Sequence, residues 1–198
     1  YNGFLSGISL RGDRFFYTNP LASDGSHARS PWFGTPCCPT NIVRFLPSLA
    51  GYAYARQGDR LYVNLFGGSK VRTAIDGNTI HLTQETEYPW DGDVRIGVEA
   101  EQPQEFALCI RIPGWARNRP VPSDLYRFTE VHPEDVELAV NGERVREPEM
   151  EEGFAIIRRE WKTGDMIRLH LPMPIRRVRS HEKVLENRGR VALQRGPV

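Results

Sequence analysis

Cysteine is scarce in this chain of 198 residues, which has only Cys37, Cys38 and Cys109. Three cysteines cannot form a disulfide framework, and adjacent cysteines seldom bridge each other because the geometry is strained. The sequence therefore excludes a small secreted domain held together by disulfides. Long hydrophobic runs are also missing, since no apolar stretch approaches the roughly 20 residues that a membrane-spanning helix needs.

An excess of charge of either sign is missing as well. The 26 Lys and Arg residues nearly balance 25 Asp and Glu residues, for a net charge of +1. This balance argues against a nucleic-acid-binding protein and against a protein that binds anionic membranes. Unpaired cysteines without a visible signal sequence favour a cytoplasmic location. Because the chain starts at Tyr1 rather than Met and stops at Val198 without a polar tail, we expect both ends to be cuts in a longer protein.

A helix is predicted after the cysteine pair, ending near Arg56, with Thr40 or Asn41 as its cap and a kink at Pro47. Its apolar residues occupy almost every face: Ile42, Val43, Phe45, Leu46, Leu49, Ala50, Tyr52, Ala53 and Tyr54. A helix that is apolar all round requires burial on all sides. Either the following sheet covers it, or its neighbours are helices outside this chain; we favour the second interpretation.

From about Asp59 onward, apolar residues alternate with polar ones, which is typical of β-strands. Strands are predicted at 61–66, 70–75, 79–85, 94–99, 106–112, 136–140, 154–161, 166–171 and 190–194, with a surface loop over 117–133. Asp76-Gly77-Asn78 is a strong hairpin signal. The predicted fold class is mainly β: an antiparallel, jelly-roll-like β-sandwich over 58–198, preceded by an irregular segment and one α-helix.

The adjacent cysteines stand at a position that favours chemistry. Cys109 lies within an alternating strand, where a thiol is expected to pack as a small apolar side chain. Cys37 and Cys38 precede a helix start instead, where the helix dipole favours the thiolate. One sulfur could bind a metal while its neighbour faces a substrate. Spacing alone does not identify a zinc site, because zinc signatures usually combine two CxxC pairs.

The segments Trp32-Phe33-Gly34, Cys37 to Arg44 and Ser48 to Tyr54 closely resemble the Cys-Cys-Pro-x-Asn region of glycoside hydrolase family 127, typified by β-L-arabinofuranosidases. Further segments fit the same family: Tyr1-Asn2-Gly3, Arg14 to Leu21, Arg111 to Ala116, Asn141-Gly142-Glu143, Arg159 to Asp165 and Asn187 to Pro197. The resemblance covers nearly the whole chain except the 117–133 loop.

This resemblance implies an α/α-barrel catalytic domain followed by β-sandwich domains, with residues 1–57 as the end of a truncated barrel and 58–198 as the sandwich. It also implies retaining hydrolysis of arabinofuranose-type sugars through a glycosyl-cysteine intermediate, assisted by zinc. By motif position, Cys37 resembles the nucleophile and lies near the metal, and Cys38 resembles a zinc ligand. Tyr17, Asn19 and Trp32 are candidates to face the sugar, although packing is the alternative role for each.

The remaining residues of such a site are not found upstream of the cysteine pair. The resemblance implies a glutamate and a further cysteine on zinc and a glutamate as acid/base, yet residues 1–36 contain neither glutamate nor cysteine. His27 is the nearest substitute ligand in sequence. We therefore expect that this chain alone neither holds zinc tightly nor hydrolyses glycosides.

A non-catalytic reading remains open, in which the β-sandwich is a carbohydrate-binding or structural module and the cysteine pair is incidental. Trp90 is a loop aromatic of the type that sugar-binding modules use, but one tryptophan does not make a binding platform. The basic run Arg176-Arg177-Val178-Arg179 is expected to be a solvated or docking face rather than a nucleic-acid site. The apolar helix predicts self-association of the isolated chain.

Overall fold

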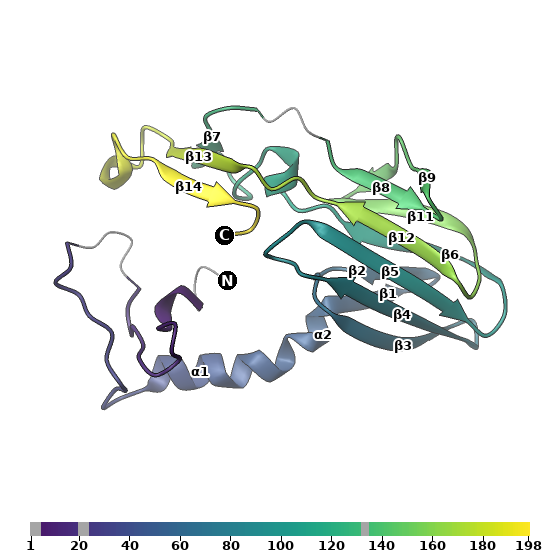
Figure 1. Cartoon of the computed structure of the whole chain (residues 1–198), viewed down its shortest axis with the longest axis horizontal. Coiled ribbons are helices and arrows are strands. Elements are labelled where there is room, and N and C mark those ends of the chain that lie inside the picture. The colour runs from purple at the N-terminus through teal and green to yellow at the C-terminus, as the bar shows by residue number, and fades with distance from the viewer. Residues whose placement is uncertain (1–4, 20–23, 132–134) are drawn as a thin grey trace. The chain divides into compact units, whose positions relative to one another are not determined.

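The computed structural model describes residues 5–19, 24–131 and 135–198, and the chain divides into two compact units (Figure 1). Unit 1 comprises Tyr1–Gly51 with Val198, and unit 2 comprises Tyr52–Pro197. Among the described residues, no helix is long and apolar enough to cross a membrane.

Unit 1 is largely irregular and contains one α-helix of more than a single turn. The 3-10 turn η1 (Leu5–Gly7) is followed by isolated bridges that pair Phe15 with Ile8 and with Ser30. Helix α1 (Cys37–Phe45) then leads into the 3-10 turn η2 (Leu46–Ser48) and the short helix α2 (Ala50–Ala53). Pro47, where a kink was predicted, lies in this 3-10 turn, which interrupts the α-helix.

The predicted cap of this helix was wrong. Helix α1 begins at Cys37, and its N-cap position is Pro36, which offers no side-chain cap. Thr40 Oγ1 instead donates to the Pro36 carbonyl at 2.9 Å, and Asn41 Nδ2 donates to the Cys37 carbonyl at 2.9 Å. Short polar side chains within a helix bond the preceding turn in this way. Both residues therefore fold back over the start of the helix instead of preceding it.

The C-terminal limit of the helical stretch was also wrong. Helix α2 ends at Ala53, and β1 (Tyr54–Gln57) pairs antiparallel with β2 (Arg60–Val63), so a hairpin occupies the residues expected to finish the helix. No residue of α1 is buried, and Val43 and Phe45 are 57% and 50% exposed.

Unit 2 is built from three sheets, which Figure 1 shows. The five-stranded sheet has the order β1-β2-β6-β11-β10, the six-stranded sheet β3-β4-β5-β12-β8-β9, and the three-stranded sheet β14-β13-β7. Every described strand pair is antiparallel except β2 with β6. The other bounds are β3 (Ser69–Ile75), β4 (Asn78–Thr86), β5 (Asp93–Ala100), β6 (Gln104–Arg111), β7 (Tyr126–Phe128), β8 (Glu137–Val140), β9 (Glu143–Arg144), β10 (Glu149–Glu151), β11 (Phe154–Trp161), β12 (Asp165–His170), β13 (Ile175–Ser180) and β14 (Ala192–Arg195).

The core lies between the five- and six-stranded sheets, so the β-sandwich prediction is confirmed. Alternate residues of the strands point inward, and the buried set includes Leu61, Ile80, Leu82, Ile96, Phe106, Leu108, Ile110, Ile157, Trp161, Ile167 and Leu169. Trp161 is fully buried, and its Nε1 donates to the Phe106 carbonyl at 3.1 Å.

Cys109 is buried on the central strand β6, as predicted for a thiol that packs as a small apolar side chain. Burial raises the pKa of this thiol to about 11, which leaves it protonated and unreactive at neutral pH.

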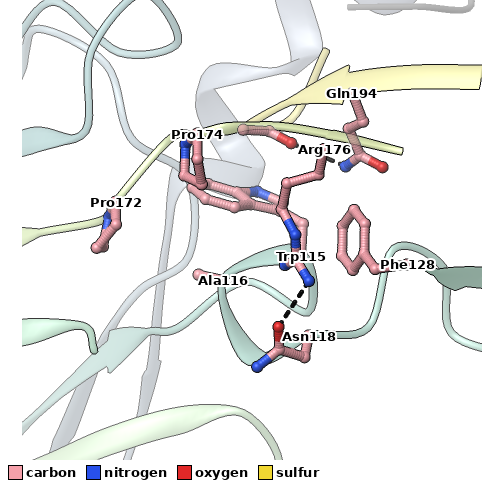
Figure 2. A pocket seen from close by; sticks show the side chains of 9 residues that line it. Trp115, Ala116, Asn118, Phe128, Pro172, Pro174, Arg176 and Gln194 are labelled. Carbon is pink, nitrogen blue, oxygen red and sulfur yellow. Dashed lines mark hydrogen bonds between the residues drawn. The ribbon is translucent and has the colours of Figure 1, made fainter. Parts of the chain in front are cut away.

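Two strands of the third sheet were not predicted. β7 lies in the segment expected to be a loop, and β13 coincides with the basic run around Arg176. Figure 2 shows the Arg176 guanidinium over the Phe128 ring, with its carbon 3.4 Å from the ring centroid. The same group donates to Asn118 Oδ1 at 2.7 Å and to the Glu130 carbonyl at 2.6 Å. Arg176 is therefore a packing residue of this sheet rather than part of a free basic surface.

A buried carboxylate fastens the β8–β9 turn to β12. Asn141 and Gly142 form this turn with φ angles of 53° and 85°. Asn141 Nδ2 donates to Asp165 Oδ1 at 2.8 Å, and the Lys162 backbone N–H donates to Asp165 Oδ2 at 2.9 Å. Asp165 is 2% exposed. Both carboxylate oxygens thus have a donor where water has little access.

This carboxylate makes the stability of unit 2 depend on pH. Burial acts to raise the pKa of Asp165, but the Asn141 and Lys162 donors hold it below its ordinary value. A carboxylate with a lowered pKa stabilises the folded state above about pH 4, and that stability is lost as the pH falls through the folded pKa. We expect Asp165→Asn to lower the free energy of unfolding by about 1–3 kcal/mol at pH 7, and by less at pH 3.

Urea unfolding followed by tryptophan fluorescence at both pH values measures the difference. The exposed Asp124 offers a matched control, because Asp124→Asn removes the same charge outside this network. A deficit for Asp165→Asn that is equal at pH 7 and pH 3 would contradict the assignment.

Candidate functional site

Helix α1 places two thiols side by side at its start. Cys37 and Cys38 are the first two residues of the helix, and both side chains are exposed. Their Sγ atoms lie 3.8 Å apart. The first backbone N–H groups of a helix carry partial positive charge, which favours a thiolate over a thiol. The prediction that the pair stands at the positive end of a helix is therefore confirmed.

The Tyr17 hydroxyl contacts both sulfurs. It lies 3.0 Å from Cys37 Sγ and donates to Cys38 Sγ at 3.2 Å. The Tyr17 ring meets Phe33 edge to face, with centroids 5.0 Å apart, and this contact positions the ring. Tyr17 was predicted as a candidate sugar contact, and the structure places it against the cysteines. Nothing in the spacing of 20 residues indicates this contact.

This contact changes the acidity of the groups involved. The hydrogen bond from Tyr17, followed by that from Cys38, lowers the pKa of the Cys37 thiol below its usual range. The same bonds to Cys37 and Cys38 raise the pKa of Tyr17 above its usual range. Tyr17 thus stays protonated as the donor, and Cys37 is the sulfur best suited to accept as a thiolate.

The other predicted residues take different positions. Trp32 is 51% exposed and contacts Phe15 edge to face at 5.6 Å and Phe33 at 5.8 Å, so Phe33 links it to Tyr17. Asn19 Nδ2 donates to Ser6 Oγ at 3.4 Å, which ties it to the η1 turn. The His27 ring stacks on Phe16 at 4.9 Å, and its Nε2 lies 3.1 Å from the Thr18 carbonyl. Of these candidates, Tyr17 therefore contacts the cysteines directly, whereas His27 contacts Phe16 and the Thr18 carbonyl instead.

The spacing of the two sulfurs fits a shared metal ion. A tetrahedral zinc ion with Zn–S bonds of about 2.3 Å holds two sulfurs about 3.8 Å apart. The Cys37–Cys38 separation is 3.8 Å. A structural or catalytic zinc site needs at least three protein ligands. Within the ranges that the structure describes, no group of three or more His, Cys, Asp or Glu side chains could hold a metal ion. Among the described residues, only the spacing of these two sulfurs therefore matches such a site.

Family comparisons divide the chain into two matched segments. Residues 60–173 match the model of the β-L-arabinofuranosidase GH127 middle domain, and residues 1–51 match that of the β-L-arabinofuranosidase GH127 catalytic domain. The cysteine pair and Tyr17 fall within the catalytic-domain match. The sandwich strands from β2 to β12 fall within the middle-domain match, whereas β1 lies just before it.

Individual relatives agree with these matches. A non-reducing end β-L-arabinofuranosidase of Bifidobacterium longum is 31% identical over 216 residues, covering 100% of this chain and 30% of the relative. A solved GH127 β-arabinofuranosidase superposes with a TM-score of 0.90 at 44% identity, over 98% of this chain and 30% of that one. A GH127 β-L-arabinofuranosidase from Geobacillus stearothermophilus T6 gives a TM-score of 0.81 at 40% identity, with the same coverage. The chain thus spans about 30% of the length of these relatives.

The tyrosine–thiol contact predicts a measurable reactivity. Tyr17→Phe removes the donor and leaves the ring, so the pKa of Cys37 should rise toward its ordinary value and less thiolate should be present at neutral pH. We expect alkylation of Cys37 by iodoacetamide to slow, and its pH profile to move to higher pH. Peptide mass spectrometry after timed alkylation reports each cysteine separately.

Phe16→Leu is a neighbouring control that keeps the hydroxyl. An alkylation profile of Cys37 that is unchanged in Tyr17→Phe would contradict the role of this hydrogen bond.

Proposed function

Because this chain belongs to glycoside hydrolase family 127, the family of β-L-arabinofuranosidases, we propose that it carries the nucleophile of a retaining glycoside hydrolase that acts on arabinofuranosides. The observation that carries this proposal is the position of Cys37. Its sulfur is exposed at a helix start, 3.0 Å from a tyrosine hydroxyl and 3.8 Å from a second sulfur. Each of these features favours a nucleophilic thiolate.

The reaction uses Cys37 where most retaining glycosidases use a carboxylate. The Cys37 thiolate attacks the anomeric carbon, a C–S bond forms, and the glycosidic C–O bond breaks while a general acid protonates the leaving oxygen. Water then attacks the same carbon and gives a proton to the deprotonated form of that general acid, and the C–S bond breaks to return the thiolate. Two displacements at one carbon retain its configuration. Tyr17 contributes by donating to the sulfur that bears the charge before attack and after release.

The proposal includes a zinc ion, which the sulfurs of Cys37 and Cys38 would both bind. When bound, it would keep the thiols deprotonated at neutral pH and orient them. Residues 1–36 contain no glutamate and no further cysteine. We therefore propose that the chain alone binds zinc weakly and lacks the general acid, so that turnover requires segments beyond these residues. The preference for a cytoplasmic location rests on the unpaired thiols and stays a prediction.

The catalytic proposal predicts a selective effect of substitution. In a gene product that contains this chain together with the further segments of its relatives, Cys37→Ala should lower kcat on a nitrophenyl β-L-arabinofuranoside by at least about 10⁴-fold, as removal of a nucleophile does. Cys109→Ala is the matched control, because Cys109 is buried in the sandwich and should leave kcat near its original value. Turnover by Cys37→Ala within tenfold of the parent would contradict the proposal.

The isolated chain gives a second result for the same proposal. Metal analysis after purification should find much less than one zinc per chain, and the nitrophenyl substrate should not be hydrolysed. Stoichiometric zinc together with turnover by these 198 residues would overturn the proposed dependence on further segments.

A second candidate function is a carbohydrate-binding or structural module with an incidental cysteine pair. Trp90 favours it, since this side chain is 70% exposed and the Trp90 carbonyl accepts a hydrogen bond from Arg195 Nη1 at 2.8 Å, which steadies its loop. Under this alternative, Cys37→Ala leaves turnover intact, and a neutral oligosaccharide binds the isolated chain in a Trp90-dependent way.

Exposed apolar side chains on the helical segment predict self-association. Val43, Phe45, Leu46 and Leu49 are between 37% and 57% exposed. We propose that two or more copies of the isolated chain cover these side chains, since contiguous apolar surface drives association in water. Light scattering should show a mass that rises with concentration, and Phe45→Lys should shift the molecule toward the monomer.

Leu193→Lys is the control, because it introduces the same charge at an exposed leucine of β14, outside the helical segment. It should leave the mass measured by light scattering equal to that of the parent chain. A monomer of the parent chain at every concentration would contradict the proposal.

A further inference from the structure

The outer face of the six-stranded sheet carries a groove that the hydrolase proposal does not use. It runs over β5, β12, β8 and the β8–β9 turn, with a volume of about 480 Å³. These strands are adjacent in the sheet order (Figure 1). Val94, Leu138 and Leu169 are buried beneath it, so the side chains between them face solvent. All of these residues belong to unit 2.

One row of residues crosses this groove and is rich in arginine. In register, Arg95 of β5 lies opposite Arg168 of β12, Arg168 lies opposite Ala139 of β8, and Ala139 lies opposite Arg144 of β9. Like charges directly opposite each other on neighbouring strands are destabilising. Within the described part of the chain, neither Arg95 nor Arg168 forms an ion pair. An anion between these arginines would relieve the repulsion.

Ala139 makes room for such an anion. Its short side chain lies between Arg168 and Arg144, whose strands are two spacings apart, about 9–10 Å at the backbone. Guanidinium groups present planar pairs of N–H donors that match a carboxylate. A carboxylate above Ala139 could thus accept hydrogen bonds from both sides.

The neighbouring row has the opposite character. Asp93 lies opposite His170, and His170 lies opposite Glu137. His170 Nδ1 is 2.9 Å from Asp93 Oδ1, and Arg144 Nη1 is 3.8 Å from Glu137 Oε1. Glu85 of β4 also stands opposite Arg95. These oxygens accept hydrogen bonds from hydroxyl groups and repel a bare anion.

We propose that this groove binds an acidic sugar, with its carboxylate between Arg168 and Arg144 and its hydroxyl groups toward Asp93, His170 and Glu137. A simple anion gains from the arginine row but is repelled by the neighbouring carboxylates. A neutral sugar gains from the carboxylates but leaves the facing arginines uncompensated. A polyhydroxylated carboxylate matches both rows. This site is independent of the cysteine pair and would serve for binding rather than for bond cleavage.

Titration of the 198-residue chain by amide NMR tests this assignment with three probes: trigalacturonic acid, a neutral galactotriose and sodium acetate. At about 0.15 M salt, long-range attraction between exposed charges is largely screened. We expect trigalacturonic acid to give saturable shifts confined to β5, β8, β9 and β12. We expect no saturation with the neutral trisaccharide, and none with acetate at the same carboxylate concentration.

Variants locate the ligand. Arg168→Gln should weaken the binding of trigalacturonic acid by about tenfold, as the loss of a charge-assisted hydrogen bond does. Ala139→Leu should weaken it to a similar extent, because the larger side chain fills the space between Arg168 and Arg144. Arg72→Gln is the matched control, because Arg72 is an exposed arginine of β3 in the same sheet and does not line the groove. Amide spectra show directly whether each variant is folded.

Absence of saturable shifts with trigalacturonic acid would overturn the proposal. Equal weakening by Arg72→Gln would show a diffuse charge effect and would also overturn it. Saturation by acetate at matched concentration would replace the acidic-sugar site with a plain anion site.

Discussion

The acidity of the cysteine pair depends on one contact: a tyrosine hydroxyl lies within hydrogen-bond distance of two sulfurs at the start of a helix. Helix α1 fixes Cys37 and Cys38 in consecutive positions, and their sulfurs stand 3.8 Å apart. Tyr17, in edge-to-face contact with Phe33, brings its hydroxyl within hydrogen-bond distance of both. Without this donor the pair would be two exposed thiols. With it, the pKa of the Cys37 thiol lies below its usual range, which favours the thiolate.

The two units differ in how much apolar surface they bury. Unit 2 has a core of its own between two sheets, where fully buried side chains such as Trp161 are satisfied internally. Unit 1 has little buried apolar surface, and its helix leaves Val43 and Phe45 open. Apolar burial is the main source of folding free energy. The sandwich is therefore the part of the chain that burial stabilises most, whereas the cysteine pair and Tyr17 stand on the unit with less buried apolar surface.

Sequence patterns predicted the sandwich well because alternation reports burial directly. The turn at Asp76-Gly77 joins β3 to β4 as an antiparallel hairpin, as predicted. The pattern failed where another requirement took over. Tyr54 to Gln57 continues an apolar helical run, yet its backbone pairs with β2. β13 lacks the alternation of apolar and polar residues, because arginines occupy both of its faces: Arg176 packs on Phe128, while Arg177 is exposed. The contact of Tyr17 with the cysteines depends on the path of the chain between them, which no spacing rule encodes.

We propose that Cys37 becomes covalently attached to the sugar during turnover. Rapid acid quenching of a gene product that contains this chain, in the presence of a nitrophenyl β-L-arabinofuranoside, followed by fragmentation of the peptide with both cysteines, tests it directly. We expect one pentosyl group on the sulfur of Cys37 and none on that of Cys38. A pentosyl group on a carboxylate side chain, with both sulfurs unmodified during turnover, would contradict it.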